Sequence, residues 1–168
     1  IILPAEASSN LARYDGMRYG LSLPGKDLMD TYKQTRGKGF GKEVRRRLML
    51  GTYVLSHGYY DAYYGSAIKV AQAIRSELQA TFDVVDVIMT PTAPTLAFKF
   101  GEKMNDPMAM KLSDLFTVPA NVAGIPGIAI PSGPAEHNLV HSLQFMAPHF
   151  GEKLLFEIGK KCEDIFKE

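Results

Sequence analysis

Three short apolar runs, at residues 84–90, 127–130 and 142–146, limit what this chain can fold into. The first run is rich in β-preferring residues and stops at Pro91, and the second is followed at once by Pro131, so both are typical of buried strands. Helical segments separate these runs, and this alternation predicts an α/β domain with at least partly parallel strand pairing. Because the edges of so small a sheet need cover, we expect the sheet to continue into polypeptide outside this sequence.

The rest of the chain favours helices. Val44, Leu48, Gly51 and Leu55 recur at spacings that place them on one face, which predicts a helix over residues 42–56. Further helices are expected over residues 5–13, 27–35, 60–78 and 112–123, with a break at Pro119 in the last of these. A closing amphipathic helix over residues 151–166 is expected to turn these side chains inward: Leu154, Leu155, Ile158, Cys162 and Ile165.

Composition excludes several classes of protein. The chain has 168 residues, of which 46% are hydrophobic and 22% charged, as in an ordinary globular domain. A net charge of +1 gives no electrostatic footprint for nucleic acid, and the single cysteine excludes an internal disulfide framework. No apolar run has the length of a membrane span. The chain opens with an apolar stretch and without Met, so we expect it to begin partway through a longer polypeptide.

A run of three arginines is the first candidate site. At about 100° per residue, Arg46 points nearly opposite the apolar stripe of its helix, whereas Arg47 falls on the shoulder of that stripe. A guanidinium at the edge of a core is suited to bidentate capture of a carboxylate. The alternative is a structural ion pair or a solvated basic face, which is common for surface arginines.

Asp114 is the second candidate. Its carboxylate could bind a ligand ammonium or amide N–H group. The alternative is an acidic residue in the first turn of a helix, favoured by the helix dipole, with Ser113 as the N-cap.

Other patterns favour a structural role over a binding role. The five tyrosines between residues 53 and 64 could stack on bases, but their helical spacing favours core and interface packing. The four histidines lack metal-ligand spacing on a helix, and the glycines at 37, 39 and 41 lack the strand and the lysine–hydroxyl ending of a phosphate-binding loop.

Several longer segments resemble the A subunits of the tRNA-dependent amidotransferases, within the amidase-signature family. Two narrow motifs are EASSNLARYDG at residues 6–16 and RGKGFG at residues 36–41, the second continued by EVRRRLMLGTY at 43–53 and YYDAYY at 59–64. Two wider motifs are DVIMTPTAP at residues 86–94 and PAN with GIPG at residues 119–127. These motifs follow in the family's order over nearly the whole chain.

The resemblance implies a fold and a function. The fold is the C-terminal part of the amidase-signature domain, a mixed sheet flanked by helices, over residues 1–168. Such an A subunit hydrolyses glutamine, and the B subunit of the complex uses ATP, Mg²⁺ and the ammonia to amidate glutamate or aspartate on misacylated tRNA. A small C subunit completes a heterotrimer in the cytoplasm or an organellar matrix, with no membrane involved. No cofactor is implied for this chain.

The resemblance also assigns residues. Arg47 matches the arginine that holds the α-carboxylate of glutamine, and Asp114 matches the aspartate near its α-amino group. The family's Ser-Ser-Lys catalytic residues have no match here, because Ser8 and Ser9 belong to a different motif, so the chain alone is expected to be inactive. The alternatives are part of a stand-alone hydrolase of small amides, or a non-enzymatic docking module.

Two departures from the family's pattern are visible. Residues 139–144 read LVHSLQ where the family commonly has Leu-Pro-x-Gly-Leu-Gln, which predicts an altered turn before the last strand. Ser132 replaces a motif cysteine.

Overall fold

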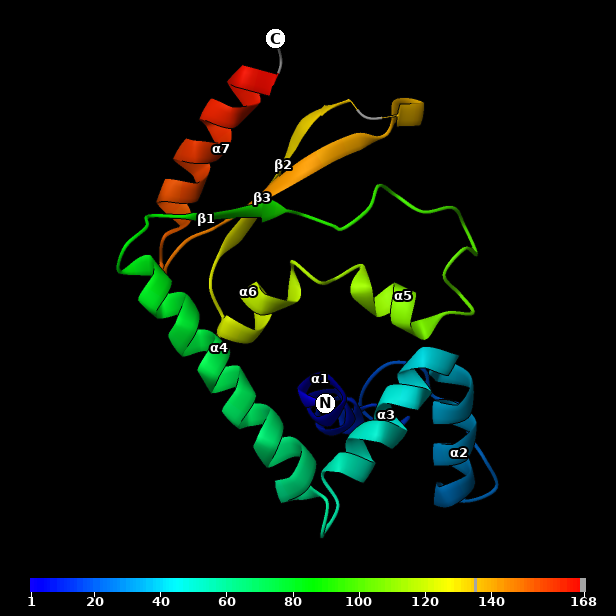
Figure 1. The fold of residues 1–168 in the computed structure, drawn as a ribbon. Helices are drawn as coiled ribbons and strands as arrows, with labels where there is room; N and C mark the ends of the chain where they lie inside the picture. The colour runs from blue at the N-terminus through cyan, green and yellow to red at the C-terminus, as the bar shows by residue number, and fades with distance from the viewer. Residues whose placement is uncertain (135, 167–168) are drawn as a thin grey trace. The chain divides into compact units, whose positions relative to one another are not determined.

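The computed structural model describes residues 1–134 and 136–166. The chain divides into two compact units, Ile1–Val70 and Ala71–Glu168, here called the N-terminal unit and the C-terminal unit. Helix α4 (Ser66–Phe82) runs across the division. Each unit has its own packing (Figure 1).

The N-terminal unit is helical. It contains α1 (Ile2–Asn10), the short 3-10 turn η1 (Leu11–Arg13), α2 (Leu28–Gly39), α3 (Lys42–Val54) and the π-helical turn η2 (Asp61–Gly65). Asp27 caps α2 by accepting a hydrogen bond from the Asp30 backbone N–H at 2.8 Å. Phe40, in extended backbone, ends this helix.

Helices α1 and α3 pack closely because α3 carries a glycine at the contact. A Cβ atom on Gly51 would collide with the Pro4 backbone and would lie 2.7 Å from the Ser8 Cβ. Ala5 on α1 and Val54 on α3 are buried beside this crossing. Of the apolar stripe predicted for residues 42–56, Gly51 lies in this contact and Val44 and Leu48 are half-buried, but Leu55 is 37% exposed, contrary to the prediction.

Two residues of α2 hold the loop that follows η1. The buried Thr35 hydroxyl accepts a hydrogen bond from the Leu23 backbone N–H at 3.0 Å. The Arg36 guanidinium donates to the backbone oxygens of Leu11 at 3.1 Å and Tyr14 at 2.9 Å. These bonds give a long irregular segment the backbone partners that it cannot supply itself.

The C-terminal unit is built on a three-stranded antiparallel sheet with the order β1-β3-β2. The strands are β1 (Ile88–Pro91), β2 (Gly127–Pro134) and β3 (Val140–Met146), with Ile88 and Gly127 both opposite Met146. Between β1 and β2 lie α5 (Pro107–Leu112) and α6 (Val118–Ala123), and the 3-10 turn η3 (Glu136–Asn138) joins β2 to β3. Figure 1 shows β3 running between the other two strands.

Helix α7 (Glu152–Phe166) closes the core against one face of this sheet. The buried core consists of Ile130, Phe145, Ala147 and Leu155. Gly159 allows the helix to approach closely, since a Cβ atom there would lie 3.2 Å from the Ile128 Cδ1. Ile158 and Cys162 pack against this core as predicted, but Ile165 is 65% exposed, contrary to the prediction.

The mixed α/β class is confirmed, but the predicted parallel pairing is wrong for the described residues. Both strand pairs are antiparallel, and the order β1-β3-β2 places the last strand between the two earlier ones. The strand expected over residues 84–90 begins only at Ile88, as β1, and the other two strands are longer than predicted. Of the helix expected over residues 112–123, only the second half forms, as α6, because α5 ends at Leu112 and turns follow it. Pro119 lies in the first turn of α6, where proline is tolerated, so the break precedes it.

Replacing Gly51 with alanine tests the α1–α3 contact. The added methyl group must displace α1, and we expect a loss of about 1–3 kcal/mol in the free energy of unfolding. Gly37→Ala on α2 is the matched control, because a Cβ atom there meets nothing within 4 Å. The control is expected to be neutral or to gain up to about 1 kcal/mol from helix propensity. Denaturant unfolding measures both, and equal effects would contradict the close contact.

Candidate functional site

Arg47 lies on α3 in a cluster with Glu43 and Arg46. Its Nε donates to the Glu43 Oε1 at 2.8 Å. Arg46 binds the same carboxylate through two nitrogens, Nε to Oε2 at 2.8 Å and Nη2 to Oε1 at 2.7 Å. These bonds, from Arg46 first and Arg47 second, lower the pKa of the Glu43 carboxyl to about 2.

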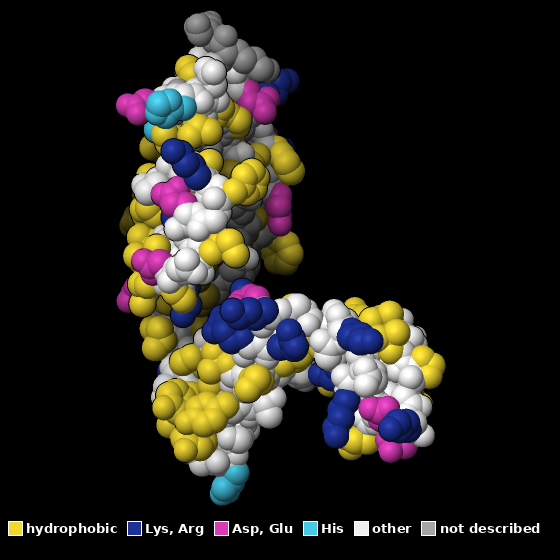
Figure 2. All heavy atoms as spheres, turned by 90° about the vertical axis from the view of Figure 1, so that its right-hand side faces the viewer, with side chains coloured by type: hydrophobic (Ala, Val, Ile, Leu, Met, Phe, Trp, Pro, Cys, Tyr) yellow, Lys and Arg dark blue, Asp and Glu magenta, His cyan; other side chains and the backbone are white. Residues whose placement is uncertain are grey.

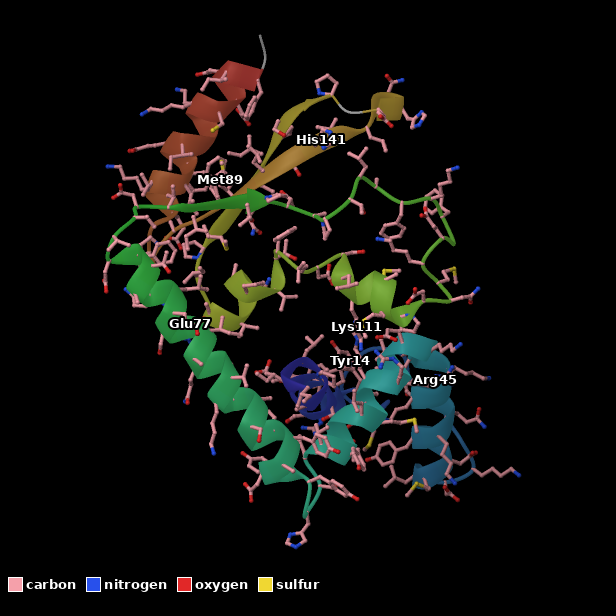
Figure 3. All side chains as sticks on the ribbon, viewed as in Figure 1. Tyr14, Arg45, Glu77, Met89, Lys111 and His141 are labelled. Atoms are coloured by element: carbon pink, nitrogen blue, oxygen red, sulfur yellow. The ribbon has the colours of Figure 1, made fainter. Side chains whose placement is uncertain are left out.

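The cluster distinguishes the three arginines. Arg46 is engaged edge-on with Glu43, and Arg45, labelled in Figure 3, is exposed. The Arg47 side chain is the less exposed of the two that contact Glu43, at 41% against 54% for Arg46, in agreement with the helical-wheel prediction. Among the described residues only its Nε is hydrogen-bonded. The two terminal nitrogens of Arg47 therefore remain able to bind a carboxylate as a pair.

Asp114 lies in the connection between α5 and α6. Ser113 ends α5 rather than capping the start of a helix, and the N-cap of α5 is Asp106, so the first-turn reading of Asp114 is wrong. The Asp114 backbone oxygen accepts from the N–H groups of Thr117 and Val118 at 3.2 and 3.0 Å. Its side chain is exposed, and no described residue forms a hydrogen bond or ion pair with the carboxylate. The carboxylate is thus presented from a turn and open to a cationic group.

Side chains of the C-terminal unit hold the α5–α6 connection and the end of α6. Gln144 on β3 donates to the Phe116 backbone oxygen at 2.8 Å. Arg75 on α4 donates to the backbone oxygens of Ala123 at 3.1 Å and Val122 at 3.4 Å, which satisfies carbonyl groups at the end of α6. Neither residue was predicted to have this role. The sequence does offer a signal for Gln144, because an amide side chain within an apolar strand needs a hydrogen-bond partner.

Arg47 belongs to the N-terminal unit and Asp114 to the C-terminal unit, so the surroundings of each residue are described within its own unit. Two surface hollows lie in the N-terminal unit. One is lined by residues of the 23–38 region, and the other by α1 with Leu55, Tyr60 and Tyr64. Arg47 lines neither of them.

The tyrosines form a surface cluster rather than a core. Tyr53 and Tyr59 have ring centroids 4.5 Å apart, and Tyr63 lies about equally far from both, at 6.2 and 6.1 Å. All three are more than two-fifths exposed, which contradicts the predicted core packing. Exposed hydrophobic side chains are found in both units, and Figure 2 shows one face of them in yellow.

Residues 1–134 and 136–166 show neither a metal cluster nor a membrane-spanning helix. No three His, Cys, Asp or Glu side chains in these ranges are grouped to hold a metal ion. No helix there combines the length and the apolar character that crossing a bilayer requires.

The altered segment at residues 139–144 still forms its strand. The turn before β3 has His137 and Asn138 at positive φ, 58° and 61°, a conformation in which histidine and asparagine are enriched. Strand β3 begins at Val140, and the Ser142 backbone oxygen accepts from the Thr92 N–H at 3.1 Å. The segment therefore still pairs with β2, from Ser142 opposite Pro131 to Val140 opposite Pro134, with a register shift between these two pairs.

Comparison with known proteins gives a consistent result. Residues 1–156 match the family described as Amidase. The A subunit of glutamyl-tRNA(Gln) amidotransferase from Parvibaculum lavamentivorans is 54% identical over 163 residues, 97% of this chain and 33% of that protein. The protein of the same name from Moorella thermoacetica is 53% identical, with the same two coverages. The chain therefore spans about one third of the length of these curated relatives.

Solved structures give the same picture. The crystal structure of the A subunit of glutamyl-tRNA(Gln) amidotransferase from Thermotoga maritima matches with a TM-score of 0.56 and 43% identity, over 76% of this chain and 28% of that one. 6-Aminohexanoate cyclic dimer hydrolase matches with a TM-score of 0.66 but 15% identity, over 98% of this chain and 33% of that one. The second match shows a likeness of fold alone.

The Glu43 cluster makes a testable prediction about protonation. Because the carboxyl pKa is lowered from 4.5 to about 2, the cluster stabilises the fold fully above pH 4.5, and this contribution is lost as the pH falls toward 2. An NMR titration of the Glu43 side chain should show the low midpoint. Arg46→Ala should raise the pKa more than Arg47→Ala, since Arg46 is the larger cause. A midpoint near 4.5 in the unaltered protein would show that the cluster does not form.

Proposed function

The chain belongs to the amidase family, and from that membership we propose that it is the substrate-binding part of the A subunit of a tRNA-dependent amidotransferase. The observation that carries this proposal is 51–54% identity to such subunits over 97–99% of the chain. Its identity to the other amide hydrolases of similar fold is 13–21%. This contrast favours the tRNA enzyme over a stand-alone hydrolase of small amides.

The proposed reaction is hydrolysis of glutamine to glutamate and ammonia. The ammonia then converts Glu-tRNA(Gln) to Gln-tRNA(Gln), or Asp-tRNA(Asn) to Asn-tRNA(Asn). The B and C subunits of the amidotransferase are the proposed partners, with ATP and Mg²⁺ assigned to the B subunit. The setting that fits this role is the cytoplasm or an organellar matrix, where tRNA is charged.

Arg47 is proposed to bind the α-carboxylate of glutamine. Its two terminal nitrogens match the two oxygens of a carboxylate in spacing and charge. Glu43 and Arg46 support this role, because the bond from Nε to Glu43 fixes the plane of the guanidinium before a ligand arrives. A side chain already held in place loses less conformational entropy on binding.

Asp114 is proposed to bind the α-amino group of glutamine. An ammonium group next to an ionised carboxylate gains a charge-assisted hydrogen bond. The exposed position of Asp114 on a turn held by Phe116 and Thr117 supports this role.

Truncating Arg47 in the intact enzyme tests the carboxylate role. We expect Arg47→Ala to raise KM for glutamine by on the order of tenfold or more, because a charge-assisted pair is lost. Arg47→Lys should restore only part of this, since lysine cannot bind both oxygens in one plane. Steady-state glutaminase kinetics measure the effect.

The matched control is Arg45→Ala, on the same helix and exposed to solvent. Its KM should stay within about twofold of the unaltered enzyme, as is usual for surface charges. If Arg45→Ala and Arg47→Ala raise KM equally, the arginine run acts as a general basic surface and the assignment to Arg47 is wrong.

A second experiment tests where catalysis resides. Purified residues 1–168 should release no ammonia from glutamine above the rate in buffer, because we assign the family's catalytic serines and lysine to the longer protein. Circular dichroism of the same sample reports whether the helices have formed. Glutamine hydrolysis by this chain alone would place a nucleophile within it and overturn the assignment.

A further inference from the structure

Gln144 is one of two buried polar residues that the structure describes, with 6% of its surface exposed. Its amide nitrogen donates to the Phe116 backbone oxygen at 2.8 Å and to the Thr90 Oγ1 at 3.2 Å. A glutamine in the middle of an apolar strand has a desolvation cost unless it is hydrogen-bonded, so these two bonds account for its presence there.

The partner of Gln144 determines which way its amide faces. A backbone carbonyl only accepts hydrogen bonds, so the atom 2.8 Å from the Phe116 oxygen must be the NH₂ group. Successive side chains of a strand point to opposite faces. Phe145 packs with Leu155 of α7, so Gln144 faces away from α7, toward the α5–α6 connection.

This contact fixes one point of a short turn. Phe116 lies two residues after Asp114, and the Asp114 backbone oxygen closes the turn by accepting from Thr117 and Val118. The far end of α6 is held separately, by Arg75 at Val122 and Ala123. Gln144 therefore provides a direct hydrogen bond from the sheet to the segment that carries Asp114.

We infer that Gln144 is a positioning residue for substrate: it holds the Asp114–Phe116 turn on the sheet so that the Asp114 carboxylate meets the α-amino group of the amino-acid substrate. This inference rests on the proposed function, which gives Asp114 its ligand. Gln144 does not touch the substrate in this assignment and acts only through the turn.

The test uses the complete amidotransferase with glutamine as the probe. Gln144→Met keeps the length of the side chain and removes both donors. We expect KM for glutamine to rise about fivefold, which corresponds to one lost hydrogen bond, with kcat changed less than about twofold. A purely structural role predicts a lower melting temperature with KM unchanged, and that result would overturn the inference.

Thr90→Val is the matched control. It removes one partner of the same amide and leaves the bond to the Phe116 oxygen in place. Its KM should stay within about twofold of the unaltered enzyme, whereas a rise equal to that of Gln144→Met would show that the turn contact is not the cause.

A double-mutant cycle separates this inference from the proposed function. Asp114→Asn alone should raise KM, and an unchanged KM would refute the proposed role of Asp114 itself. If that variant does raise KM, adding Gln144→Met to it should have little further effect, because the turn no longer presents a carboxylate. Independent, multiplying effects would overturn the positioning role of Gln144 and leave that of Asp114 standing.

Gln144→Glu gives a second variant if the methionine variant folds poorly. An ionised carboxylate at residue 144 repels the Phe116 carbonyl, whereas a protonated one can donate to it. The KM defect of this variant should shrink as the pH is lowered toward the pKa of the new carboxyl, relative to the unaltered enzyme at each pH. A defect independent of pH would contradict a role based on donation to Phe116.

Discussion

Strand β3 organises the C-terminal unit because its two faces contact different elements. On one face Phe145 packs with Ile130 and Leu155, which joins the sheet to α7. On the other, Gln144 donates to the Phe116 oxygen and joins the sheet to the turn that carries Asp114. The alternation of side chains along a strand makes both contacts possible from adjacent residues. Core stability and the presentation of a candidate ligand group therefore depend on the same pairing register.

In the N-terminal unit, one charged cluster on α3 orients a second candidate residue, Arg47. One carboxylate, Glu43, receives hydrogen bonds from both Arg46 and Arg47, and its pKa is lowered to about 2. Exposed ion pairs of this kind contribute little to stability, so the more informative consequence is geometric. Arg46 is bound through two nitrogens and Arg47 through one, which leaves different parts of each guanidinium open. Membership of the amidase family and the similarity to amidotransferase A subunits suggest the ligand proposed for the two terminal nitrogens of Arg47.

Local patterns predicted those features that local physics controls. The 42–56 periodicity gave α3 within two residues of its end, and the apolar runs located all three strands. The wheel position of Arg47 correctly placed it deeper than Arg46. The parallel pairing was wrong because the alternation of strands and helices fixes neither the order of the strands in the sheet nor the direction in which each one runs. The Ser113 cap was wrong because α5 ends at this residue and the next helix, α6, begins only at Val118.

By itself, the sequence determined the family, the helices and strands with clear periodicity, and the candidate residues Arg47 and Asp114. Only the tertiary structure decided the antiparallel order β1-β3-β2, the contact of Gln144 with Phe116, and the hold of Arg75 on the end of α6. The reason is physical. Periodicity reports which face of an element is apolar, whereas a hydrogen bond between residues 28 or 48 positions apart depends on how the chain returns on itself.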